Sequence, residues 1–287
     1  MRRKLFYHLM KIFLTALLGT VIAAVLVRLA PGFDSDAQQL DPRLSHESVE
    51  ALRLRRAVNG NIMKFCIYYL AASARGEFGK SLTFNRDVRE LIAERLPVTV
   101  RIVISGLAVG WFFTVMVALS AAALRFGVYD AIAGIVAGAL LCIPTAALGL
   151  FFMMWRAPAS VAIALVVFPH TFRYARELLV SKYETPHVMT ARAKGLGPLR
   201  VLVFHVLPVC AVPLVAVAGA SVTIALGAAV PVEVLCGIPG IGQLAWQAAL
   251  ARDLSLLVTL TMLVTILTVG ANSAADLLNS SQPRATA

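Results

Sequence analysis

Residues 207–230 read LPVCAVPLVAVAGASVTIALGAAV and contain no charged side chain. An α-helix rises about 1.5 Å per residue, and the hydrocarbon layer of a membrane is roughly 30 Å thick. About 20 mainly apolar residues are therefore enough to cross it. This stretch of 24 residues is predicted to be a transmembrane helix.

Other stretches pass the same test of length and apolarity. They are Ile12–Ala30, Ile102–Leu124, Ala131–Trp155 and Leu254–Ala271, the last of which can continue to Leu278. A weaker apolar stretch, Ala157–Phe168, is followed at once by Pro169 and several ionisable residues. We interpret it as one tilted helix, kinked at Pro169, whose polar half lies against protein and not lipid. The sequence thus predicts an all-α polytopic membrane protein with about six spans.

The composition agrees with this class. Hydrophobic residues make up 59% of the chain and charged residues only 14%, whereas soluble proteins carry roughly 25% charged residues. Moreover, 19 of the 41 charged residues lie within residues 31–96, so most of the remaining chain is compatible with lipid. A soluble enzyme, a disordered tail and a small disulfide-rich secreted domain are excluded.

The distribution of the net charge of +11 along the chain indicates how the chain is oriented in the membrane. Cationic residues concentrate in the first 11 residues and in Arg173–Arg200, and together these segments supply eight of the eleven net charges. Lys and Arg favour the cytoplasmic side, so both segments and both termini are predicted to be cytoplasmic. A signal peptide also has a basic start and an apolar centre, but here the apolar run is long and lacks a clean small-x-small cleavage site. Nucleic acid is not needed to explain the charge.

Residues 31–96 are then external and, on their pattern, helical. Ser45 can cap a first short helix, Asn61–Ala74 forms a second, and an apolar stripe along Asp87–Leu96 indicates a third. Pro97 is expected to separate this third helix from the second span.

Catalytic and cofactor motifs are absent from the sequence. There is no G-x-x-x-x-G-K-[ST], H-E-x-x-H or G-x-S-x-G, and the five histidines are dispersed, so neither a catalytic residue, a cofactor nor a metal site is predicted. Cys142 and Cys210 are interpreted as packing residues, and a disulfide between the external Cys66 and Cys236 is conceivable. The five clear spans hold almost no ionisable groups, which weakens an ion-coupled carrier and indicates energy delivered from outside the chain.

The cytoplasmic segment contains a specific pattern. The sequence A-R-A-K-G at 191–195 is followed, after a gap of ten residues, by V-L-P at 206–208. Small residues allow a helix starting at Thr190 to approach a partner closely, and Arg192 and Lys194 can pair with acidic groups there. Gly195 and Gly197 permit a sharp turn after it.

This pattern resembles the EAA loop of ABC importer permeases, and T-A-R-A-K-G-L at 190–196 looks like the dipeptide/oligopeptide/nickel branch. The external stretches D-P-R-L-S (41–45), R-G-E-F-G-K-S-L (75–82) and R-L-P-V-T (95–99) are similar to the same branch. So is the run P-V-E-V-L-C-G-I-P-G-I-G-Q-L at 231–244, which resembles its external re-entrant segment. The loop departs from the family pattern at Pro186, His187 and Met189.

The resemblance implies a chain organisation of four parts. These are residues 1–30 (cytoplasmic start and first span), 31–96 (external helices), 97–278 (a five-helix permease core), and 279–287 (cytoplasmic tail), with a coupling loop at 181–203 and the re-entrant segment at 231–253 inside the core. It also implies a non-enzymatic subunit of the bacterial inner membrane. Its partners would be a second homologous permease, two cytoplasmic ABC ATPases and an extracytoplasmic solute-binding protein.

Two groups of site residues follow from the resemblance. The first contacts an ATPase: Thr190, Ala191, Arg192, Ala193, Lys194, Gly195 and Leu196. The second forms the external gate or meets the binding protein: Glu233, Gly237, Pro239, Gly240 and Gly242. A helix cap is the competing interpretation of Glu233. Peptides are the expected solute, with nickel or another small solute next, and an ion-coupled secondary transporter or a membrane-embedded hydrolase remain the alternatives from other classes.

Overall fold

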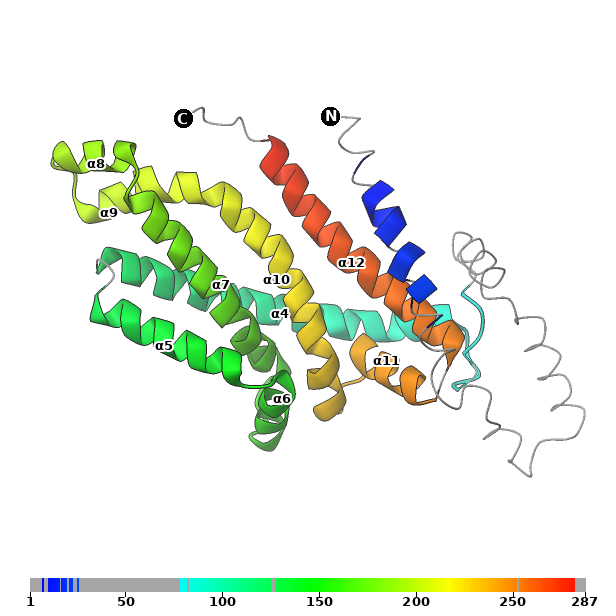
Figure 1. Ribbon diagram of the computed structural model, residues 1–287. Coiled ribbons are helices and arrows are strands. Elements are labelled where there is room, and N and C mark those ends of the chain that lie inside the picture. The colour runs from blue at the N-terminus through cyan, green and yellow to red at the C-terminus, as the bar shows by residue number, and fades with distance from the viewer. Residues whose placement is uncertain are drawn as a thin grey trace, which may run out of the picture. The chain divides into compact units, whose positions relative to one another are not determined.

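The computed structural model describes residues 7, 10–15, 17–19, 21, 22, 25, 78–81, 83–124, 127–251 and 253–281. Across these residues the regular secondary structure is helical, apart from one isolated antiparallel bridge between Lys80 and Asp87 (Figure 1). The predicted all-α class is confirmed. The first two predicted external helices, and Cys66 with its conceivable disulfide, lie outside the described residues.

The described helices follow one another with short connections. In chain order they are α4 (Val88–Ala123), α5 (Val128–Cys142), α6 (Thr145–Met154), α7 (Ala159–Tyr183), α8 (Pro186–Ala193), α9 (Pro198–Val201), the π-helical turn η1 (Leu202–Val206), α10 (Leu207–Leu235), α11 (Ile241–Leu250) and α12 (Leu254–Ser281). An N-terminal helical stretch, Met10–Gly19, precedes them.

Among the described residues, three helical stretches are long and apolar enough to cross a membrane: Val88–Ala123, Pro198–Leu235 and Ser255–Asn279. The pair α5 and α6 also passes if it is taken as one broken span. The remaining two of the six predicted spans correspond to α7, whose second half is polar, and to the N-terminal helix, which is only partly described.

The expected separation at Pro97 is wrong. A single helix, α4, runs through this residue from Val88 to Ala123, so the third external helix and the second span are continuous. Proline removes one backbone hydrogen bond, but neighbouring groups in membrane helices commonly compensate for that loss.

The predicted span Ala131–Trp155 is instead broken into two helices that meet at 93°. The break falls at Ile143 and Pro144, where Ile143 has extended backbone angles (φ −83°, ψ 120°). A proline disfavours the helical conformation of the residue before it, which explains why α5 ends here. Cys142, expected to be a packing residue, is exposed at this end, whereas Cys210 is buried as expected.

The described chain divides into two compact units, which we treat separately. One comprises 95–243 and 267–281, and the other the described residues of 9–94 with 244–266. In the first unit, α7 packs along α10 and α5, and α6 packs against α7 and α10. Gly106 and Gly110 of α4 allow close approach to α7, because a Cβ at Gly106 would lie 2.8 Å from the Ile163 side chain.

A partly buried ion pair joins α5 to α7 within the first unit. The Arg176 guanidinium donates from Nε to Asp130 Oδ1 at 2.7 Å and from Nη2 to Oδ2 at 2.5 Å. Asp130 is only 3% exposed. The polar half of α7 therefore places one of its cations against protein, as its sequence predicted.

Candidate functional site

The short helix α8 has two different faces. Val188 and Ala191 are 0% and 3% exposed and pack into a hydrophobic cluster with residues of α4, α5, α7 and α10. Met189, Thr190, Arg192, Ala193 and Lys194 are exposed. The buried pair fixes the helix on the bundle and leaves the other face exposed.

The start of α8 differs from the prediction. The helix begins at Pro186 and not at Thr190, because proline at the first helical position has its φ angle already fixed and loses no intrahelical bond. The Thr190 hydroxyl donates to the Pro186 carbonyl at 2.9 Å, within the helix. Pro186, one of the departures from the family pattern, therefore extends the helix by one turn.

The end of α8 is a complete Schellman motif. The N–H of Gly195 donates to the Arg192 carbonyl at 2.9 Å, and that of Leu196 donates to the Ala191 carbonyl at 3.4 Å. Gly195 has φ +78°, a conformation that side chains with a Cβ disfavour. Leu196 packs against the same hydrophobic cluster as Ala191, so the turn is anchored on both sides.

The two cations of the predicted coupling segment have different surroundings. The Arg192 guanidinium lies over the Tyr183 ring, 5.1 Å from its centroid, in a cation–π arrangement. Arg192 is thus positioned by α7, while Lys194 extends from the exposed end of the helix.

Glu233, predicted for the external gate, is fully buried near the end of α10. Its carboxylate accepts hydrogen bonds from the Thr99 hydroxyl at 2.7 Å, the Gly242 N–H at 2.7 Å and the Gln243 N–H at 3.2 Å. These two N–H groups belong to the first turn of α11. Glu233 therefore caps α11, which is the competing interpretation that the sequence left open.

Two of the predicted gate glycines allow this arrangement. A Cβ at Gly240 would collide with the Glu233 carboxylate, and one at Gly242 would lie 2.6 Å from the Val230 Cα. Both glycines are buried. Gly237, with φ +64°, and Pro239 are exposed instead, so they form the accessible part of the turn between α10 and α11.

A second capping carboxylate lies in the other unit. Asp253, which is 1% exposed, accepts from the Ser81 hydroxyl at 2.5 Å and from the Thr83 N–H at 3.2 Å. Its other oxygen accepts from the Leu256 N–H at 3.2 Å in the first turn of α12. The end of the segment predicted to be external is thus tied to the start of α12.

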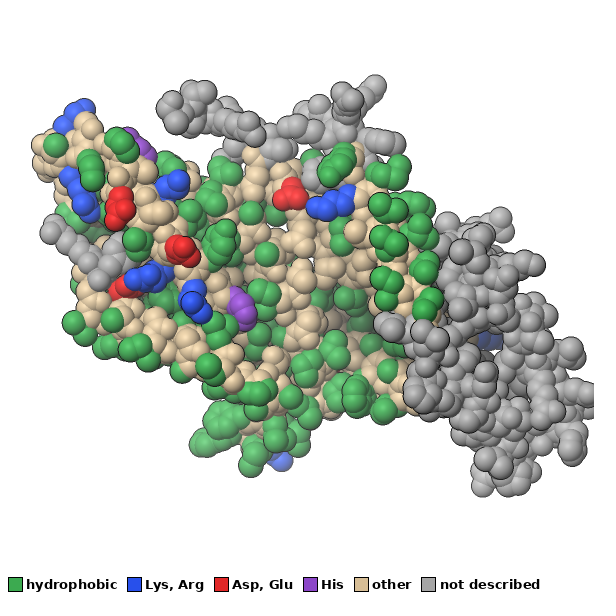
Figure 2. Space-filling view, in the orientation of Figure 1, with side chains coloured by type: hydrophobic (Ala, Val, Ile, Leu, Met, Phe, Trp, Pro, Cys, Tyr) green, Lys and Arg blue, Asp and Glu red, His purple; other side chains and the backbone are tan. Residues whose placement is uncertain are grey.

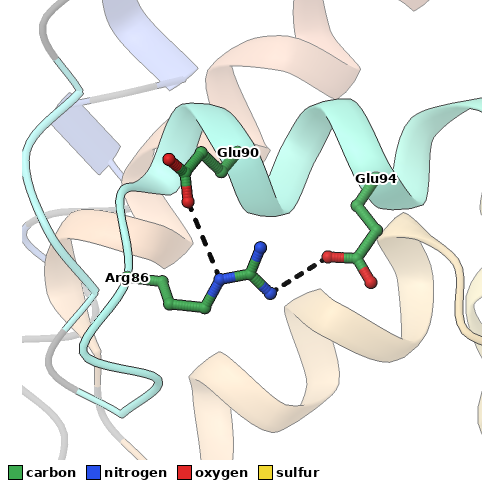
Figure 3. Close-up of polar contacts among 3 residues, drawn as sticks. All are labelled: Arg86, Glu90 and Glu94. Atoms are coloured by element: carbon green, nitrogen blue, oxygen red, sulfur yellow. Dashed lines mark hydrogen bonds and ion pairs between the residues drawn. The ribbon is translucent and has the colours of Figure 1, made fainter.

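The surface at the start of α4 carries an exposed ion-pair network. Figure 3 shows Arg86 between Glu90 and Glu94, with Nε 3.7 Å from Glu90 Oε2 and Nη1 3.1 Å from Glu94 Oε2. The three side chains are about half exposed or more, so solvent screens these pairs and their contribution to stability is small.

Two polar residues of these sites were not predicted from the sequence. Thr99 and Ser81 lie inside the stretches R-L-P-V-T and G-K-S-L, but nothing in those stretches indicates which carboxylate each one contacts.

Among the described residues, no group of three His, Cys, Asp or Glu side chains is arranged to hold a metal ion. The Cys236 thiol donates to the Gly149 carbonyl at 3.5 Å.

The long apolar helices define a multi-pass membrane protein. The family model described as binding-protein-dependent transport system inner membrane component matches residues 92–284. The chain belongs to this family, which makes it a permease of the ABC importer type.

Curated relatives agree with this assignment. The chain is 28% identical to the oligopeptide transport system permease protein OppB of Escherichia coli (strain K12), over 85% of each chain. It is 26% identical to OppB of Haemophilus influenzae over 97% of each chain. It is also 28% identical to a putative peptide permease protein of Brucella suis biovar 1 over 90% of each chain. These relatives do not favour an ion-coupled carrier, a hydrolase or a nickel permease.

Proposed function

We propose that this chain is the permease subunit through which an ATP-driven importer moves peptides across the bacterial inner membrane. The names of the relatives support peptides as the solute. The proposed complex adds a second homologous permease, two cytoplasmic ATPases and an external solute-binding protein. The termini and α8 lie on the cytoplasmic side in this proposal, in agreement with the distribution of Lys and Arg.

The observation that carries the coupling role is the division of α8 into a buried and an exposed face. Nucleotide binding on a partner can shift the permease between conformations only through contacts that differ between them. The residues proposed to make these contacts are Thr190, Arg192, Ala193 and Lys194, which are exposed, with Ala191, Gly195 and Leu196 holding the helix in place.

The segment boundaries proposed from the resemblance are compatible with the coupling role of α8. The coupling loop, residues 181–203, contains α8 and α9 and leads directly into η1 and α10. Only the turn at 194–197 separates α8 from α9, so we expect a displacement of α8 to reach the long span α10. The external re-entrant segment, 231–253, contains α11 and both capping carboxylates.

The test is a substitution on the exposed face of α8. Ala193→Trp adds bulk there without changing the Schellman turn, whereas a substitution at Gly195 would also strain the backbone. We expect Ala193→Trp to abolish co-purification of the ATPase and peptide uptake by the assembled complex. Ala131→Trp, on an exposed position of α5, is the matched control and should retain both. Normal ATPase binding and uptake with Ala193→Trp would contradict the coupling role.

The external turn is proposed to meet the binding protein through Gly237 and Pro239. Because Glu233, Gly240 and Gly242 are buried, they act by shaping the turn. Pro239→Arg should weaken docking of the binding protein and leave the thermal stability of the permease unchanged. Unaltered docking affinity would exclude this surface.

A further inference from the structure

The helix α7 has two unlike halves. From Ala159 to Pro169 every side chain is buried or half-buried. From residue 170 onward one stripe is exposed, and its members recur at the helical spacing of three and four residues: His170, Arg173, Tyr174, Glu177 and Ser181. In Figure 2 the charged and histidine side chains gather over α7 and α8, whereas the surface of α6 is largely hydrophobic.

This polar stripe begins at a depth where lipid tails are expected. The eleven residues from Ala159 to Pro169 rise about 16 Å, which is only half of the roughly 30 Å hydrocarbon layer. If α7 enters the layer at Ala159, the next two turns lie largely within the other half, although the charge distribution had grouped Arg173 with the cytoplasmic segment. Ionisable groups at such depth face water or protein and not hydrocarbon.

The contacts of α7 show which of its polar groups are already satisfied. On the covered face, Phe172 and Leu179 are buried in the hydrophobic cluster. Arg176 is neutralised by Asp130. Arg173 and Glu177, in contrast, make no hydrogen bond or ion pair with any residue that the structure describes.

Building on the proposed function, we infer that the exposed face of α7 lines the aqueous path of the solute and that Arg173 binds the carboxylate of a passing peptide. A guanidinium presents a planar fork of donors that matches a carboxylate. Glu177, one turn away, repels the same carboxylate and keeps the interaction weak. A path requires binding that is favourable enough for entry and weak enough for release.

The first arm of the test measures whether water reaches the exposed face of α7. Tyr174→Cys, in a variant whose four native cysteines are replaced by alanine, is treated with a charged maleimide in open membrane fragments of the assembled complex. A thiolate reacts only where water reaches it, and the short cysteine side chain cannot extend to the interface. We expect labelling about tenfold faster than at Ile135→Cys, a 72% exposed position on α5. Equal labelling rates would overturn the aqueous path.

The second arm measures recognition of the carboxylate. Uptake of a tripeptide and of its C-terminal amide is compared at equal occupancy of the binding protein. We expect Arg173→Gln to reduce the preference for the free carboxylate about tenfold, a loss of about 1.4 kcal/mol, and Arg173→Lys to retain part of it. Lys182→Gln, which removes a cation of α7 outside the stripe, is the matched control. A general folding defect would lower uptake of both compounds and leave their ratio unchanged, which would overturn the role of Arg173.

The two arms separate this inference from the proposed function. If the assembled complex transports no peptide but Tyr174→Cys is labelled rapidly, the peptide assignment fails and the aqueous path stands. If peptides are transported while Tyr174→Cys resists labelling, the face is covered by lipid or another subunit, and the inference is wrong.

Discussion

Thr99 donates a 2.7 Å hydrogen bond to Glu233, a residue 134 positions later in the chain. The same hydroxyl oxygen accepts a hydrogen bond from the Ile241 N–H at 2.7 Å. Three segments, namely α4, the end of α10 and the start of α11, therefore meet at one pair of side chains. All of these groups are buried, so each partner satisfies what would otherwise be a costly unpaired polar group.

Removal of the Glu233 charge should destabilise the permease. Glu233→Gln retains the shape but weakens three hydrogen bonds to a buried acceptor, and we expect a loss of about 2 kcal/mol. Thermal unfolding of the purified protein in detergent provides the measurement. Glu90→Gln, at an exposed ion pair, is the control and should change the free energy of unfolding by less than about 0.5 kcal/mol. A midpoint as high as that of the parent would show that the cap contributes nothing.

The two capping residues should be energetically coupled. If the Thr99 hydroxyl acts through Glu233, the double variant Thr99→Val with Glu233→Gln should lose less stability than the sum of the single variants. We expect a coupling free energy of about 1 kcal/mol in a double-mutant cycle. Strict additivity would mean that the two residues act independently.

A methyl group at Gly242 should not be tolerated. Its Cβ would lie 2.6 Å from the Val230 Cα, and backbone cannot move aside as a flexible side chain can. We expect Gly242→Ala to cost about 1–3 kcal/mol, measured by thermal unfolding. At Gly227, in α10, a Cβ would have no neighbour within 4 Å. Gly227→Ala should therefore be neutral or slightly stabilising, and a similar loss at both positions would disprove the steric explanation.

The ion pair between α5 and α7 should contribute more to the stability of the permease than the exposed ion pairs do. Asp130→Asn leaves the Arg176 guanidinium without its carboxylate, and we expect a loss of about 2 kcal/mol. Because the Arg176 side chain is 39% exposed, water replaces part of the interaction, and the loss should stay below that of a fully buried pair. Denaturation midpoints of Asp130→Asn and of Glu94→Gln, an exposed carboxylate, make the comparison. Equal midpoints would exclude a specific role for Asp130.

The turn after α8 should depend on glycine at only one of its two positions. Gly195 has φ +78°, so Gly195→Ala strains the backbone by about 1 kcal/mol, whereas Gly197 has φ −63° and open space at its Cβ position. We expect Gly195→Ala to lower ATPase co-purification with the complex and Gly197→Ala to leave it unchanged. Identical behaviour of the two variants would remove the conformational argument for Gly195.

Much of the fold was predictable because membrane helices can be recognised in a sequence by their length and apolarity. The stretch 207–230 appears in the structure as the first 24 of the 29 residues of α10, and Leu254–Ala271, with its continuation, as α12. Interruptions were less predictable. Pro97 was expected to break a helix and does not, whereas Pro144 breaks a stretch that looked continuous. A proline removes one hydrogen bond in either place, and the surrounding chain decides whether the helix continues.

The candidate sites show the same division. The A-R-A-K-G pattern located α8 and its terminal turn from the sequence, because small residues and glycine carry local conformational information. The role of Glu233 was not decided there, because a carboxylate near an external turn suits either a docking contact or a helix cap. Only its complete burial and its bonds to Thr99 and α11 distinguish the two.

The class, the approximate spans and the family could be read from the sequence, since hydrophobicity, charge bias and local motifs are properties of contiguous residues. Packing in three dimensions was needed to show that Ser81 meets Asp253 and that Asp130 neutralises Arg176. It also shows that Arg173 has no such partner among the described residues. These outcomes depend on which distant segments pack together. A buried charge is stable only with its partner, and the identity of that partner is fixed by packing and not by sequence spacing.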